Sequence, residues 1–356
     1  MRKTRSTLVR WVGIISVVST AAVSFAVPVA SGAAAHSRSA KATAAPLQIA
    51  YFASADANGF SEAVWQGAQA EAKVLGNVQL TELDGNFSAT TQFDQLQTAA
   101  TSKQYSGAIA LLNDTVGSVP AVQQLIASGT AVSALLNPEG SNLDSLSPQV
   151  PGLLETIAAP SYDTALQAQQ VVKYCTGKKD CTVVIFIGGL VYPFDKVRYD
   201  SFLSVLKPHK NIHVLALGQG NYDVDTSLSV MQNILKAHPK FDVLLSASDQ
   251  STVGVEIALK DAGWNVPKMI KNGSFFVDSL GGSEQGVAEV RDGFSNLTVQ
   301  NSPYTAGELG LAQVVNDIRG NNVQTIINLD KASPVPLILT KSVLAKHPKY
   351  KGQWNV

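Results

Sequence analysis

The sequence has few cysteines, no excess of charge of either sign and no stretch of five or six like charges. Its 356 residues carry 27 basic and 27 acidic side chains, so the formal net charge at pH 7 is zero. Nucleic acids and polybasic membrane sites both require a concentrated positive surface. The absence of such a cluster argues against both kinds of partner, and it favours a small ligand that is uncharged or carries compensated charge.

Motifs of catalysis, metal binding and dinucleotide binding are also scarce. The five histidines form no H-E-x-x-H pattern, and His209 and His213 flank a turn without a third ligand, so we expect no metal site. The stretch "GGSEQG" lacks the G-x-S-x-G spacing of a nucleophile elbow, and "GQG" at 218–220 is not completed to G-x-G-x-x-G. We therefore expect neither an enzyme nor a bound cofactor.

The first 46 residues are typical of a secretory signal peptide followed by a tether. An apolar run from Trp11 to Ala30 follows four basic residues, and "SGAAAHS" offers a cleavage site after about Ala35. The alternative is an uncleaved membrane anchor, because the run approaches the length that spans a bilayer. No cysteine follows the run, which excludes a bacterial lipid anchor at that point. We expect an exported protein, periplasmic or extracellular, that is associated with the cell envelope.

The only two cysteines, Cys175 and Cys181, flank a polar turn in "YCTGKKDC". Two nearby cysteines in an exported chain most often form a disulfide. A metal site would need more ligands, and a redox pair would need C-x-x-C spacing. We therefore predict a structural disulfide between them.

Short apolar runs alternate with amphipathic segments from residue 47 onward, which predicts βαβ units and parallel sheets. A Pro-, Ser- and Gly-rich stretch at 138–152 separates two similar α/β halves, so we expect two Rossmann-like lobes with a ligand crevice between them. The predicted strands are 47–53, 78–85, 107–113, 131–137, 155–159, 182–189, 211–217, 243–246, 268–274 and one near 323–329.

Polar and aromatic residues follow these strands, at the edge where parallel sheets bind ligands. The strand ends read "ASADANGF", "LLNDT", "LLNPE", "IGGLVYPF", "LGQGNYD", "SASDQ" and "KNGS". Amide and hydroxyl groups together with aromatic faces suit a polyhydroxylated ligand.

The chain resembles the sugar-binding proteins of bacterial ABC importers, the type I periplasmic-binding family, and within it the ribose-binding branch. The segments that carry the resemblance are "VMQNILKAHPKFDVLLSASD", "GFSEAVWQGAQAEAKVLG" and "KVRYDSF", and it covers about residues 47–340. It implies a monomer that closes its lobes around a small carbohydrate-like ligand and delivers it to a membrane permease. It also implies three hinge crossings, near 138, 302 and 331, with residues 47–138 and 303–331 in the first lobe and 139–302 and 332–356 in the second.

The resemblance also implies the ligand contacts, although several family residues differ here. The family's stacking aromatics fall at Phe60 and Tyr222, but its Asp-Arg pair reads Leu136-Asn137. Its Asn before Asp249 is Ser248, and its later Asp is replaced around Asn272. The residues that we expect to contact ligand are Asp56, Phe60, Asn113, Asn137, Tyr192, Lys196, Tyr222, Ser248, Asp249, Asn272 and Asn301.

The lost Asp-Arg pair changes the expected ligand. A charged hydrogen bond contributes about 1.5 to 3 kcal/mol against about 1 kcal/mol for a neutral one, so ribose should not bind in the family's usual way. The neutral amides, with Tyr192 and Phe194, suit a less polar sugar derivative, a larger glycoside or a non-sugar metabolite.

Ordinary structural roles remain alternatives for several of these residues. Asp249 suits the N-cap of a helix that begins near Ser251, Lys196 suits a solvated helix face, and Arg198 suits a pair within its own lobe. At the level of function, the alternatives are a sensory module that presents its closed lobes to a membrane receptor, and a secreted hydrolase, for which we find no nucleophile and base.

Overall fold

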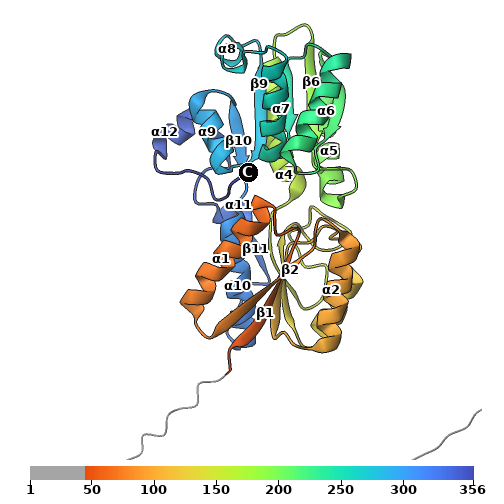
Figure 1. Cartoon of the computed structure of the whole chain (residues 1–356), viewed down its shortest axis with the longest axis vertical. Coiled ribbons are helices and arrows are strands. Elements are labelled where there is room, and N and C mark those ends of the chain that lie inside the picture. Colours follow the sequence, from red (N-terminus) through yellow and green to blue (C-terminus); the bar gives the residue numbers. More distant parts are fainter. Residues whose placement is uncertain (1–44) are drawn as a thin grey trace, which may run out of the picture. The chain divides into compact units, whose positions relative to one another are not determined.

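A computed structural model of the protein describes residues 45–356. The expected signal peptide and most of the expected tether lie outside these residues. None of the helices between residues 45 and 356 is long and apolar enough to cross a membrane. This part of the chain contains two sheets flanked by helices (Figure 1), which confirms the predicted α/β class. We call the sheet that contains β1, with its helices, the first lobe, and the sheet that contains β6, with its helices, the second lobe.

The first lobe contains a parallel sheet in the order β11-β5-β4-β3-β1-β2. Side chains of strand β1 alternate between two cores: Tyr51 packs toward α1 and α10, and Phe52 packs toward α2 and α3, because successive residues of a strand point to opposite faces. The elements are β1 (Leu47–Ala53), β2 (Val78–Asp84), β3 (Gly107–Ala110), β4 (Ala131–Leu136), β5 (Leu153–Ile157), β11 (Ile326–Asn328), α1 (Gly59–Leu75), α2 (Ala89–Ser102), α3 (Val119–Ala127) and α10 (Pro303–Ile318).

The second lobe contains a sheet in the order β12-β10-β9-β8-β6-β7, in which only the β12 pairing is antiparallel. Ile185 of β6 packs toward α4 and α5, and Phe186 packs toward α6 and α7. The elements are β6 (Cys181–Ile187), β7 (Ile212–Gln219), β8 (Val243–Ser246), β9 (Phe276–Gly281), β10 (Leu297–Gln300), β12 (Ile338–Thr340), α4 (Pro160–Cys175), α5 (Pro193–Leu206), α6 (Val224–Ala237), α7 (Asp249–Asp261), α8 (Val266–Lys271), α9 (Glu284–Asp292) and α12 (Lys341–Lys346).

The first crossing between the lobes lies later in the chain than the predicted position near 138. Strand β5 pairs with β4 in the first sheet, so the chain passes to the second lobe only after Ile157. The Pro- and Gly-rich stretch before β5 is a loop of the first lobe, held by the Glu139 amide, which donates to Glu155 Oε1 at 3.0 Å. The chain returns to the first lobe between β10 and α10. After α11 (Leu329–Ala332) it passes to β12 in the second lobe.

The sequence predicted a strand at 268–274. In the structure, this segment is instead part of α8 and the turn that follows it. The Asn265 side chain caps this helix by accepting a hydrogen bond from the Lys268 amide, and Pro267 occupies its first turn. Both features favour a helix start. The next strand is β9, which begins at Phe276.

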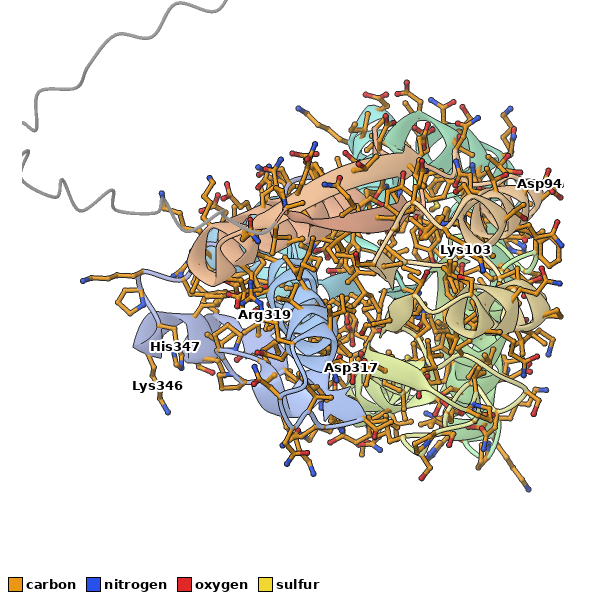
Figure 2. The ribbon with its side chains drawn as sticks, turned by 90° about the horizontal axis from the view of Figure 1, so that it is seen from below. Asp94, Lys103, Asp317, Arg319, Lys346 and His347 are labelled. Carbon is orange, nitrogen blue, oxygen red and sulfur yellow. A yellow bond between two sulfur atoms is a disulfide. The ribbon has the colours of Figure 1, made fainter. Side chains whose placement is uncertain are left out.

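The predicted disulfide between Cys175 and Cys181 is present, and it joins the end of α4 to the start of β6. In the first lobe, the ends of α1 and α10 are joined by hydrogen bonds from a side chain and not by a disulfide. Arg319, which follows α10, donates to the carbonyls of Leu75 and Gly76 at the end of α1, at 3.1 and 2.8 Å. Arg319 is labelled in Figure 2, which views the molecule of Figure 1 from below.

Candidate functional site

A cavity lies between the two lobes and is lined by residues at or just beyond the carboxyl ends of strands from both sheets. It contains about 610 Å³ of space free of protein atoms, including the part that opens to solvent. The cavity lies at the carboxyl edge of both sheets, where parallel strands bind ligands.

The first-lobe wall contains Phe60 in the first turn of α1. The Asn58 side chain fixes this turn, because its oxygen accepts hydrogen bonds from the amides of Phe60 at 3.0 Å and Ser61 at 3.4 Å. Asn113 follows β3, is buried, and donates through Nδ2 to the Ser54 carbonyl at 3.2 Å. The oxygen of the Asn113 amide can accept a hydrogen bond from a ligand hydroxyl.

A strained turn brings Asn137 to the cavity. The Asn137 amide donates to the Leu135 carbonyl at 2.9 Å, which closes a three-residue turn, and Leu136 at its centre has a φ of 70°. This left-handed conformation is unfavourable for leucine. Leu136 and Asn137 both line the cavity, and Asn137 is 3% exposed. The strained residue, Leu136, therefore lies at the candidate site, and strained backbone is often found at binding sites.

The second-lobe wall is aromatic. The rings of Tyr192 and Phe194 stack with a centroid distance of 5.6 Å, and Tyr222 lies 5.9 Å from Tyr192. Phe87 of the first lobe faces this wall, with its ring 18° from parallel to that of Tyr222 and their centroids 6.4 Å apart. Aromatic faces from both lobes therefore meet at the cavity.

A buried ion pair supports the aromatic wall from behind. Asp195 Oδ1 accepts hydrogen bonds from the Tyr222 hydroxyl at 2.6 Å and from Arg198 Nη1 at 3.2 Å, and its Oδ2 accepts from the Gly189 amide at 2.8 Å. Burial raises the pKa of the Asp195 carboxyl, and Arg198 and these hydrogen bonds partly offset that rise. The expected pair within the lobe is present, and Arg198 also reaches the cavity lining.

We expected Asp249 to face the cavity, but the structure shows that it does not line it. Its carboxylate accepts hydrogen bonds from the Ser279 hydroxyl at 2.7 Å, the Ser283 amide at 2.8 Å and the Thr298 hydroxyl at 3.0 Å. These groups belong to β9, the start of α9, and β10 of the same lobe. The N-cap of α7 is Ser248, whose hydroxyl oxygen accepts from the Ser251 amide at 3.4 Å. Asp249 therefore joins elements of the second lobe and does not line the site.

The remaining expected residues divide into two groups. The structure brings Phe60, Asn113, Asn137, Tyr192, Tyr222, Ser248 and Asn301 together around the cavity, and their contact with a ligand stays a prediction. Asp56 and Asn272 are exposed and do not line the cavity. Asn272 follows α8 and precedes β9, so it lies at the amino ends of the strands and not at their carboxyl ends. Lys196 does not line it either, since it pairs with Asp200 on the exposed face of α5.

Among the cavity residues that were not predicted as ligand contacts from the sequence are Phe87, Gln250 and Trp354. Phe87 follows β2, so the rule that identified the other strand ends could have found it. Gln250 is adjacent to two expected residues, Ser248 and Asp249. No local pattern marks Trp354, because it reaches the cavity from a segment far from any predicted strand end.

No metal site is evident in the part of the chain that the structure describes. In residues 45–356, no group of three or more His, Cys, Asp or Glu side chains lies close enough together to hold a metal ion. The polar groups that line the cavity are mostly neutral amides and hydroxyls, with Arg198 as the one charged residue among the described lining residues. Such a lining can form hydrogen bonds and stack on apolar faces.

Comparisons with known proteins agree with this geometry. A family model described as a periplasmic binding protein domain matches residues 49–322. The ribose import binding protein RbsB of Salmonella typhimurium is 28% identical over 133 residues, which are 37% of this chain and 42% of the relative. The chain thus matches less than half of that relative's length.

Two solved structures share the fold over most of the chain. One is a solute-binding protein of an ABC transporter from Agrobacterium vitis with bound D-fucose, with a TM-score of 0.73 and 16% identity, covering 87% of this chain and 100% of that one. The other is a Caulobacter myo-inositol binding protein with bound myo-inositol, with a TM-score of 0.72 and 20% identity, covering 84% and 95%. At these identities the likeness shows the fold.

Proposed function

The chain belongs to the periplasmic binding protein family, and we propose that it is an extracytoplasmic solute-binding protein that captures a small, carbohydrate-like ligand between its lobes. The observation that carries this proposal is the cavity at the facing strand ends, which is lined by aromatic residues of both lobes and by neutral amides. Sugar rings present apolar C–H faces to aromatic side chains and hydroxyls to amides. The cavity offers both kinds of contact.

Hydrogen-bond capacity supports a neutral, polyhydroxylated ligand. Asn113, Asn137 and Asn301 come from the first lobe and the hinge, and Gln250 from the second. An amide both donates and accepts, so it can pair with a hydroxyl in either orientation. The names of the relatives point the same way, because they specify ribose, D-fucose and myo-inositol.

The step that captures the ligand would be closure of the two lobes around it. The chain crosses between the two sheets after β5, between β10 and α10 and after α11, and the facing aromatic rings are contributed by different lobes. A ligand that contacts both walls binds the closed form better than the open form, so it shifts the population toward closure. We propose that a membrane permease of an ABC importer recognises the closed form and receives the ligand.

The proposal includes no catalytic step. The buried Asp195 carboxylate is occupied by Tyr222, Arg198 and Gly189 within its own lobe, so it is not free to act as a base on a ligand. We propose that the protein acts as an exported monomer without a cofactor, after removal of the segment that we expect to be a signal peptide.

A thermal-shift screen tests the proposed ligand class. The panel contains D-ribose, D-allose, D-fucose, D-arabinose and myo-inositol, with amino acids and nucleosides as the comparison set. A ligand at one hundred times its dissociation constant stabilises the folded protein by about 2.7 kcal/mol, which raises the melting midpoint by several degrees. A shift with one sugar class supports the proposal. A shift only with amino acids or nucleosides contradicts it.

A further inference from the structure

The segment that follows α12, residues 347–356, runs back from the outer surface to the cleft. Figure 2 labels Lys346 and His347, where this segment begins, and Figure 1 shows the chain end marked C between elements of the two lobes. Its beginning is fixed by Arg291, whose guanidinium donates to the carbonyls of Leu344, His347 and Tyr350 at 2.9 to 3.2 Å. We call residues 347–356 the strap.

The strap is bonded to the second lobe by its last aromatic residue. Trp354 Nε1 donates to the Gly281 carbonyl at 2.9 Å, and the Trp354 carbonyl accepts from the Glu284 amide at 2.8 Å. Tyr350 donates through its hydroxyl to Gln300 Oε1 at 2.6 Å. These bonds place the indole at the end of β9, where Gly281 itself lines the cavity.

The strap is also bonded to the first lobe. Gln353 forms two hydrogen bonds with Thr305 of α10, at 2.9 and 3.2 Å. The Trp354 ring meets the edge of the Phe60 ring with a centroid distance of 5.4 Å and an interplanar angle of 73°. A glycine at position 59 makes this approach feasible, because an ideal Cβ there would lie only 1.8 Å from the Asn355 carbonyl oxygen.

We propose that Trp354 is a ligand-binding residue that determines specificity, and that the strap seats it as one wall of the cavity. The inference rests on the function proposed above. Trp354 lines the cavity and is 4% exposed, and its only polar side-chain atom is occupied by the Gly281 carbonyl. It can therefore offer a ligand only carbon surface. The part of the ligand that faces Trp354 and Phe60 must be apolar, such as the C–H face of a sugar ring.

The seating of Trp354 is tested without a ligand. In the mature protein, which lacks the expected signal peptide and with it Trp11, Trp65→Phe and Trp264→Phe leave Trp354 as the single tryptophan, whose emission can be excited apart from that of the tyrosines. We expect a blue-shifted emission that acrylamide quenches weakly. Adding Gly59→Ala should shift the emission to the red, because the new methyl collides with Asn355. Gly189→Ala is the matched control, since its Cβ would meet no atom closer than 3.5 Å.

The ligand contact is tested by titration calorimetry with whichever of D-ribose, D-allose, D-fucose, D-arabinose and myo-inositol binds the protein. Trp354→Ala should weaken binding about ten- to a hundred-fold, as expected for the loss of one aromatic face, and Trp354→Phe should recover most of that loss. The emission of the single-Trp protein should also change when the sugar is added. Trp65→Phe, which alters a ring stacked on Tyr51 in the first-lobe core, should leave the dissociation constant unchanged.

The outcomes separate this inference from the proposed function. Sugar binding that is unaffected by Trp354→Ala overturns the inference and leaves the function intact. An emission spectrum of an exposed indole in the single-Trp protein also overturns it. If no sugar in the panel binds, the proposed function fails, and the emission comparison between Gly59→Ala and Gly189→Ala still decides whether the strap seats Trp354 in the cleft.

Discussion

Two buried aspartates of the second lobe lie at the starts of helices on opposite faces of its sheet, yet only one supports the ligand cavity. Asp195 is in the first turn of α5 and is 0% exposed; Asp249 begins α7 and is 1% exposed. Asp195 accepts from Tyr222, whose ring lines the cavity, whereas Asp249 accepts from Ser279 and Thr298 inside the sheet. Position at a strand end thus predicts closeness to the cleft, but the partners of a carboxylate decide whether it acts on the site.

The largest expected effect comes from Asp195→Ala. It leaves the Arg198 guanidinium buried without its carboxylate, which should lower the free energy of unfolding by about 3 to 5 kcal/mol. It also releases the Tyr222 hydroxyl, so ligand affinity should fall as well. Urea unfolding and titration calorimetry measure the two effects. The control is Asp200→Ala, which breaks the exposed pair with Lys196 and should change stability by less than about 1 kcal/mol. Equal effects of the two variants would contradict the supporting role of Asp195.

Asp249→Asn should separate stability from binding. The amide cannot accept all three of the hydrogen bonds that reach the carboxylate, so the free energy of unfolding should fall by about 1 to 3 kcal/mol. The dissociation constant of the ligand should stay unchanged, because the carboxylate does not reach the cavity. A weaker ligand affinity at unchanged stability would return Asp249 to the binding site.

Phe60→Ala tests the first-lobe wall of the cavity. Loss of the aromatic face should weaken ligand binding by about 1 to 3 kcal/mol, and the protein should remain folded. Calorimetry measures the affinity, and circular dichroism checks the fold. The control is Phe294→Ala, a ring that is 41% exposed and does not line the cavity. Unchanged affinity in Phe60→Ala would remove Phe60 from the site.

The smallest effect is expected for Lys196→Ala. Lys196 pairs with Asp200 on the exposed face of α5, with both side chains more than half exposed, so the substitution should leave both stability and ligand affinity nearly unchanged. Calorimetry under the conditions used for Phe60→Ala makes the comparison direct. A clear loss of affinity would mean that Lys196 turns toward the ligand when the lobes close.

The successes and failures of the sequence-based predictions have physical reasons. Strands such as β6 and β8 were predictable because buried parallel strands are short apolar runs. The prediction of a strand at 268–274 was wrong. Asn265 and Pro267 favour a helix start, but the prediction gave more weight to the apolar residues that follow them. The predicted position of the first crossing, near 138, was wrong. A Pro- and Gly-rich stretch indicates a loop, but it does not indicate which sheet contains the next strand, β5.

The sequence by itself determined the α/β class, the disulfide between neighbouring cysteines and the strand ends that supply most of the cavity lining, because all three depend on residues close together in the chain. Only the tertiary structure decided the direction of the Asp249 carboxylate, the stacking of Phe87 against Tyr222 and the arrival of Trp354 beside Phe60. Those contacts join residues that are 30 or more positions apart. Side-chain direction at a strand end depends on which distant donors and rings the packing brings within reach, and no local pattern encodes that.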